Sequence, residues 1–212
     1  MSKKLMLLSL AAVSAAVLAL PAAASAQTWH LNEAGAFTIT GGTGNLSTTS
    51  GTTIHCGSVT GSGNYETTTT GTMTLVFGPT CALGTTHCES PGAATGVIET
   101  TALPFHNVMV TTNTPGVLVT PNATGAFAHF NCGFLSFTVS GNGVLGDVEK
   151  ECGSKSVEAG VEFKATGHGV QEHTLYTGTT YRLTTAGFNA AQNTTGTIKF
   201  TNGLNRTIEC TA

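Results

Sequence analysis

Histidine and acidic side chains are the groups in this chain that could do acid–base or metal chemistry, and they are densest in the segment HGVQEH. On a β-strand, His168 and Glu172 would point to one side about 13 Å apart, whereas His173 would point to the other side. That separation is too large for joint ligation, because zinc ligands lie about 2 Å from the metal. The chain also contains neither an H-x-H nor an HExxH motif. We therefore expect these histidines to be surface residues outside any metal site.

A second group consists of acidic residues at alternate positions in the segment GDVEKEC. On a strand, Asp147, Glu149 and Glu151 would face one way, and carboxylate oxygens are the ligands that calcium prefers. Repulsion between them favours a solvated strand edge, where acidic side chains also discourage pairing with another chain. We expect no metal ion and no cofactor, and these three residues are the weak candidates to inspect first.

Hydrolytic chemistry has little support in the sequence. A GxSxG nucleophile elbow is absent. Glu158 and Glu162 would share one strand face, but about 13 Å apart along it, which is too far for a glycosidase pair. A secreted hydrolase or metal-dependent enzyme is therefore an alternative without an assigned nucleophile.

Carbohydrate binding needs exposed aromatic side chains, and the chain has few candidates. Trp29, Tyr176 and Tyr181 combine an apolar ring with a polar group. The two tyrosines flank the turn TGTT, which would place both at one end of the fold. Ordinary packing against a sheet is the favoured interpretation for the tyrosines, with ligand binding as the alternative.

The six cysteines indicate a disulfide framework. They stand at positions 56, 81, 88, 132, 152 and 210, and an even number in an exported chain is typical of disulfide bonding. The segment CALGTTHC closes a short loop, so Cys81–Cys88 is the first expected pair. Cys132–Cys152 and Cys56–Cys210 would complete the set. A zinc site is the weaker alternative, because no close CxxC pair is present.

The first residues have the three-part pattern of a secretory signal peptide. Lys3 and Lys4 precede an apolar run over 5–20, and the small residues at 24–26 form a cleavage site. A membrane anchor fits less well, because the run is short for a bilayer span. We predict cleavage after Ala26 and no membrane span in the remaining chain, so the protein is expected outside the cytoplasm, secreted or in the cell envelope.

Composition narrows the class of partner. Charged residues make up 9% of the chain, against about a quarter in an average globular protein. Without Lys3 and Lys4, six basic residues face eleven acidic ones. Nucleic acid is excluded as the expected partner, because it rewards clustered Lys and Arg.

The elements that must position these residues are β-strands. Helical periodicity is nearly absent after residue 26, and Gly, Thr and Asn mark turns every eight to twelve residues, which is typical of an all-β sandwich or barrel. The clearest alternation is SVEAGVEFKAT at 156–166, in which Val161 and Phe163 face inward. We predict a single antiparallel all-β domain over 27–212, disulfide-bonded and either a sandwich or a barrel.

The segment 125–143, GAFAHFNCGFLSFTVSGNG, is expected to seed the core. Its apolar residues occupy even positions up to Cys132 and odd positions from Leu135 onward. A straight strand cannot invert its faces in this way. The pattern predicts a hairpin or bent strand with a turn or bulge near Gly133.

The export signal, the cysteine loop followed by SPG, the segment LPFH and the turn SGNGV together resemble uncharacterised secreted β-rich proteins of bacteria. This resemblance implies one exported β domain and carries no activity, ligand or site. We expect a structural or ligand- and surface-binding protein, with carbohydrate or a cell-surface component as partner. The alternatives are the hydrolase or metal-dependent enzyme and a cell-surface assembly subunit, which would need an unpaired terminal strand.

Overall fold

The computed structural model describes residues 28–175 and 177–211, and these form an all-β, antiparallel, disulfide-bonded fold that closes into a barrel. The expected fold class is thereby confirmed. The predicted signal peptide at 1–26 lies outside the described residues. Within the described residues, no helix is long and apolar enough to cross a membrane.

A first closed ring of hydrogen-bonded strands forms the barrel, called the first ring below. In ring order its strands are β2 (Gly35–Gly41), β5 (Ser58–Tyr65), β6 (Thr70–Gly78), β10 (Leu103–Met109), β11 (Pro115–Val119), β14 (Val144–Val148), β16 (Glu158–Phe163) and β19 (Phe188–Phe200). Every pairing is antiparallel, so inward side chains alternate with outward ones along each strand.

Seven further strands join with β19 through a second closed series of pairings, called the second ring. It consists of β3 (Gly44–Thr48), β4 (Thr53–Cys56), β7 (Ala82–Leu83), β8 (Thr86–Glu89), β12 (Ala126–Cys132), β13 (Leu135–Gly141), β18 (Thr180–Thr185) and again β19. Apolar residues of both rings belong to one continuous core.

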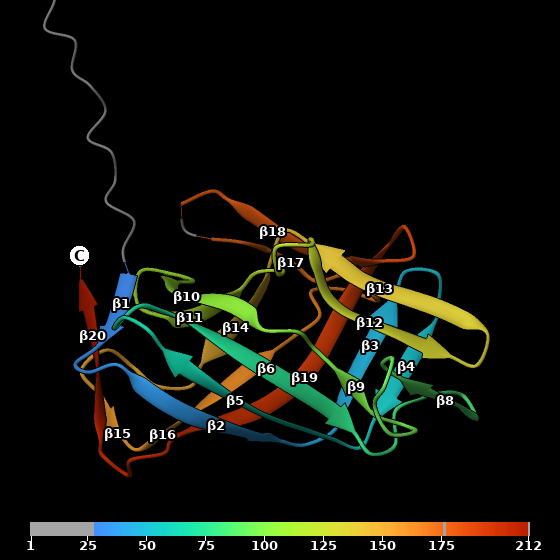
Figure 1. The fold of residues 1–212 in the computed structure, drawn as a ribbon. Helices are drawn as coiled ribbons and strands as arrows, with labels where there is room; N and C mark the ends of the chain where they lie inside the picture. The colour runs from blue at the N-terminus through green and yellow to red at the C-terminus, as the bar shows by residue number, and fades with distance from the viewer. Residues whose placement is uncertain (1–27, 176, 212) are drawn as a thin grey trace, which may run out of the picture.

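Strand β19 is the element that the two rings share. Its residues Ala190 to Asn193 pair with β3, whereas Gly196 to Phe200 pair with β2. In Figure 1 this long red strand runs from the neighbourhood of β2 and β16 to that of β3 and β18. Ala190 and Ala191 are fully buried. We call the crossover region, Ala190 to Gly196, the seam.

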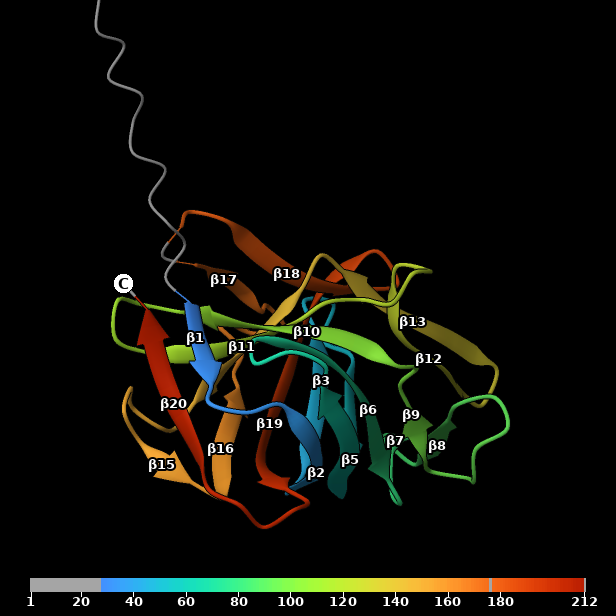
Figure 2. The same ribbon diagram turned by 60° about the vertical axis from the view of Figure 1, so that its left-hand side comes forward.

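Five short strands extend this framework. They are β1 (Thr28–Leu31), β9 (Ile98–Glu99), β15 (Lys155–Ser156), β17 (Glu172–Thr174) and β20 (Arg206–Thr211). Strand β20 lies between β1 and β15 in a small separate sheet, and Figure 2 shows β1 and β20 side by side at one side of the molecule. The first and last described strands are therefore paired with each other along their length.

Each ring has its own aromatic centre. Inside the first ring, the rings of Tyr65 and Phe105 meet edge to face with centroids 4.7 Å apart, and Phe37 packs against both. Inside the second ring, Phe130 and Phe137 stack with centroids 5.4 Å apart. Such pairs add specific geometry to the burial of large apolar surfaces.

The segment 125–143 forms the predicted hairpin. Strands β12 and β13 pair with each other, and Gly133, with φ of 61°, lies in the turn between them. The inward faces are the expected ones at Phe130 and Phe137, while Phe134 at the tip is 97% exposed. An additional register shift lies between Ala126 and Ala128, so the hairpin contains a bulge as well as the turn.

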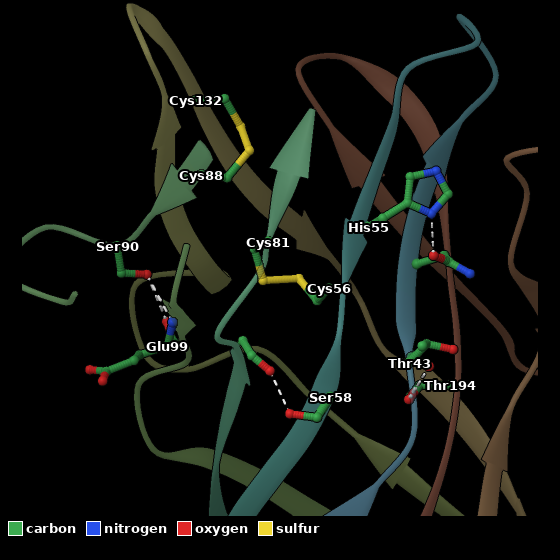
Figure 3. Close-up of a disulfide and its surroundings, with 12 residues drawn as sticks. Thr43, His55, Cys56, Ser58, Cys81, Cys88, Ser90, Glu99, Cys132 and Thr194 are labelled. Atoms are coloured by element: carbon green, nitrogen blue, oxygen red, sulfur yellow. Dashed lines mark hydrogen bonds between the residues drawn. A yellow bond between two sulfur atoms is a disulfide. The ribbon is translucent and has the colours of Figure 1, made fainter. Parts of the chain in front are cut away.

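The disulfide pairing predicted from the sequence is wrong at all three bonds. The structure joins Cys56–Cys81, Cys88–Cys132 and Cys152–Cys210, in place of Cys81–Cys88, Cys132–Cys152 and Cys56–Cys210. Figure 3 shows the first two bonds on neighbouring strands of the second ring. The third ties β20 to the chain that follows β14.

Strand register explains the correction. Cys81 and Cys88 do face each other across the β7–β8 hairpin, where the Cys88 amide donates to the Cys81 carbonyl at 2.9 Å. The Cys81 amide donates to the Gly96 carbonyl at 2.9 Å, so the two cysteines share a single backbone bond. The disulfide-bonded pairs Cys56–Cys81 and Cys88–Cys132 have their α-carbons 4.0 and 4.1 Å apart. Cys132 is the register partner of Cys88 on β12, and each cysteine of the hairpin forms its disulfide with the strand beside the hairpin.

Candidate functional site

The acidic candidates lie on the outside of the first ring. Asp147 is opposite Glu162 in the pairing of β14 with β16, and the Glu149 carboxylate occupies the space that a side chain at Gly160 would fill. Glu151 lies beyond the end of β14, where its backbone carbonyl accepts a bond from the Ser154 amide at 3.1 Å. Asp147, Glu149 and Glu151 thus follow the strand rather than surround a common point.

A lysine accompanies these acids. Lys164 Nζ lies 2.7 Å from Glu162 Oε2. The hydrogen bond and the charge of Glu162 raise the pKa of Lys164, and the charges of Asp147 and Glu149 act in the same direction. Across the described ranges, no group of three or more His, Cys, Asp or Glu side chains is arranged to hold a metal ion.

The residues of the segment HGVQEH contact different partners and do not converge on one point. Glu172 forms an ion pair with Arg182 at 3.1 Å, and His173 Nε2 lies 3.3 Å from the backbone carbonyl of Lys164. Its buried side chain is that of Gln171, which is only 2% exposed.

The expected aromatic surface is not formed by the residues that the structure describes. Trp29 is 3% exposed and its indole N–H donates to the Gly116 carbonyl at 2.8 Å, so it is a core residue of the small terminal sheet. Its expected role as an exposed binding residue is therefore wrong. Tyr181 packs against the buried cluster of Leu118, Leu145 and Leu175, and Tyr176 lies outside the described residues.

An internal cavity lies where the two rings meet, and it is the best-formed candidate site. Its volume is about 90 Å³. Its walls are almost entirely apolar, with side chains from both rings, among them Leu75, Leu103 and Val119 of the first ring and Leu46, Phe130 and Val139 of the second. Concave apolar sites with a few polar groups are the usual form of small-molecule sites.

Three polar residues reach the cavity. Thr100 Oγ1 accepts a bond from the Leu75 amide at 2.8 Å, so this hydroxyl serves the backbone. Gln192 and Thr194 stand at alternate positions of β19, on the seam. The residues that line the cavity include no ionisable side chain, so a ligand there would meet an uncharged surface.

A second, smaller cavity lies between the first ring and the terminal sheet. Its volume is about 30 Å³, which fits a single water molecule, and Tyr65 and Arg206 line it. Burial raises the pKa of Tyr65 well above its ordinary value, although its bond to Asn107 acts in the opposite direction. Arg206 is 2% exposed, pairs with Glu33 at 3.1 Å and lies over the Phe200 ring.

A larger groove of about 450 Å³ lies on the outer surface, over glycines that include Gly41, Gly160 and Gly196. The Glu149 carboxylate stands at this groove. It is shallow and open, so a molecule there would keep much of its hydration. The cavity between the two rings is more enclosed and more apolar than this groove, and we therefore take it as the candidate site although its volume is smaller.

Comparison with protein-family models, with curated proteins and with solved structures finds no match for this chain. The function has to be argued from the cavity itself.

Sequence reasoning missed Gln192 and Thr194. The available signal was the segment AAQNT, in which two alanines precede a glutamine inside a long strand. Small residues permit close packing there, and a glutamine on the inward side then needs a polar partner or a cavity.

Proposed function

We propose that this protein is an exported binding protein that takes up a small, uncharged and largely apolar molecule in the cavity between its two rings. The observation that carries this proposal is the cavity of about 90 Å³, walled by apolar side chains of both rings. Carbohydrate, the partner expected from the sequence, is set aside because Trp29 is buried and Tyr181 packs on apolar neighbours.

The physical reason for binding is the cost of an unfilled apolar space. Side chains around a void lose dispersion contacts that a ligand restores. The mostly apolar walls hold water weakly, so a ligand need not displace strongly held water over most of the cavity. Each methylene group moved from water into such a site contributes about 0.8 kcal/mol.

The alternatives have less support. A hydrolase would need a nucleophile and a base beside its substrate, and no ionisable group lines the cavity. An assembly subunit would need an unpaired terminal strand, whereas the first and last described strands, β1 and β20, pair with each other. Three disulfides favour an oxidising compartment, in agreement with the signal peptide predicted at 1–26.

The test is a titration with methyl isopropyl ketone, a neutral branched molecule, followed by NMR of the methyl groups in the protein. Saturable shifts should concentrate on cavity residues such as Leu46, Ile54, Val139 and Leu183. Ala128 also lines the cavity, so Ala128→Leu fills it and should abolish these shifts.

The matched control is Ala36→Leu, which makes the same change at an exposed position of β2 and should bind the ketone like the natural chain. Saturable binding that survives Ala128→Leu unchanged, or shifts that fall outside the cavity, would exclude this site.

A further inference from the structure

The cavity has one polar end, formed by Gln192 and Thr194. Both lie on the same side of β19, two residues apart, where inward side chains repeat along a strand. Gln192 is opposite Leu46 of the second ring, whereas Thr194 is opposite Phe163 of the first. The two polar side chains therefore both lie on the seam, one beside each ring, with apolar walls around them.

The side-chain amide of Gln192 has room because its neighbour is a glycine. A β-carbon added at Gly44 would lie 3.3 Å from Gln192 Nε2 and equally close to Phe77 Cδ1. The backbone of β19 is held at this position, because the Gln192 backbone amide donates to Gln171 Oε1 at 2.9 Å. The side-chain amide and the Phe77 ring thus both border the space above Gly44 at the cavity wall.

Thr194 adds a hydroxyl to this end. Its Oγ1 donates a long bond of 3.4 Å to the Thr43 carbonyl, a contact drawn in Figure 3. A hydroxyl that donates one bond still offers two lone pairs as acceptors. Together, Gln192 and Thr194 offer a ligand N–H donors, a carbonyl acceptor and a hydroxyl acceptor.

We propose that the ligand has a compact apolar body and a single neutral polar group, a carbonyl or a hydroxyl, which hydrogen-bonds at the Gln192–Thr194 end. This inference rests on the proposed function and names the chemical class of its ligand. A charged ligand is rejected, because a charge moved out of water needs an opposite charge and the cavity lining supplies none.

Three probes with the same branched skeleton test the proposal. Methyl isopropyl ketone carries a carbonyl, the matching alkene has a methylene group in place of the carbonyl oxygen, and isobutyrate has a carboxylate oxygen in place of a methyl group. Dissociation constants are measured by the methyl NMR titration with the folded, disulfide-bonded protein. Isobutyrate at neutral pH should give no saturable shifts at the cavity.

The decisive variants are Gln192→Leu and Gln192→Met, which remove the amide that can donate to a ketone with little change in size. Gln192→Leu should weaken ketone binding about fivefold to tenfold, the range of one net hydrogen bond, and leave alkene binding within about twofold. Gln192→Met should act in the same direction and serves if Gln192→Leu does not fold, whereas Thr194→Val removes an acceptor that a ketone cannot use and should leave ketone binding within about twofold. Thr195→Val, the neighbouring residue on the exposed side, is the matched control and should change neither affinity.

The outcomes separate this inference from the proposed function. Equal weakening of ketone and alkene, or binding of isobutyrate as tight as that of the ketone, overturns the polar-end proposal while the cavity remains a binding site. Absence of binding for both ketone and alkene overturns the binding function and this inference with it.

Discussion

Gln171 Oε1 accepts a hydrogen bond of 2.9 Å from the backbone amide of Gln192. The backbone amide of Gln171 also donates to the Ala190 carbonyl at 3.2 Å. Gln171 therefore takes the place of a neighbouring strand along β19, between the part that pairs with β18 and the part that pairs with β16. One buried side chain satisfies the backbone where the rings join.

Replacing this glutamine should destabilise the fold. Gln171→Ala leaves the Gln192 amide without its acceptor and opens a space in the core, so we expect a loss of about 3 kcal/mol in the free energy of unfolding. Urea denaturation measures it. Glu172→Ala removes only the exposed pair with Arg182 and should cost less than about 1 kcal/mol. Equal effects of the two changes would show that Gln171 does not support the seam.

The disulfide pattern predicts distinct peptides. Digestion without reduction should release Cys56 linked to Cys81, Cys88 to Cys132 and Cys152 to Cys210, identified by mass spectrometry. The Cys152–Cys210 bond closes the longest loop, with a sequence separation of 58. Replacing both of these cysteines by serine should cost about 4 kcal/mol on the chain-entropy model. A peptide linking Cys81 to Cys88 would contradict the register described for β4, β7, β8 and β12.

Tyr65 should make stability fall at high pH. Burial raises the pKa of Tyr65 in the folded state, whereas the unfolded chain ionises near the ordinary value of about 10. Below that pH both states are protonated and the full stability is present. Above it the unfolded state loses its proton first, so the free energy of unfolding falls as pH rises.

The measurement is urea denaturation at a series of pH values above neutral. Tyr65→Phe loses the bond to Asn107 at 3.0 Å but should show a shallower alkaline decline than the natural chain. Identical slopes for the two proteins would mean that the Tyr65 hydroxyl is not held in its neutral form.

Two contacts between a glutamate and a basic side chain offer a matched comparison. Arg206 is 2% exposed and pairs with Glu33, whereas His30 and Glu209 form an exposed pair at 3.0 Å. Glu33→Gln removes the charge opposite a buried guanidinium and should cost about 2 kcal/mol. Glu209→Gln should cost less than about 0.5 kcal/mol. Denaturation at neutral pH measures both, and the reverse order would refute the structural role given to Arg206.

Local patterns in the sequence predict well which residues form strands, but predict poorly which strands lie beside each other. The alternation around Val161 and the change of parity across Gly133 indicate β16 and the β12–β13 hairpin, because each reflects which side of one strand is buried. The partner of Cys81 is Cys56, twenty-five residues away in sequence, and this depends on how the second ring closes. No local signal contains that information.

The candidate site could not be predicted from the sequence for the same reason. The cavity exists only where side chains of both rings meet, among them Leu103 of the first ring and Val139 of the second. Gln192 becomes a site residue only because β19 belongs to both rings. For Trp29, the sequence suggested a binding residue where the structure shows a residue of the core. Its segment TWHL alternates between partly buried and buried positions, so it forms a strand, and its aromatic ring is used for packing.

The most direct test of the binding function is a crystal structure of the protein with methyl isopropyl ketone at a concentration that saturates the NMR titration. We predict density for the ketone inside the cavity between Leu46, Leu103 and Val139, with its oxygen about 3 Å from Gln192 Nε2. An empty cavity in that crystal, with the ketone at the outer surface, would contradict the proposed function.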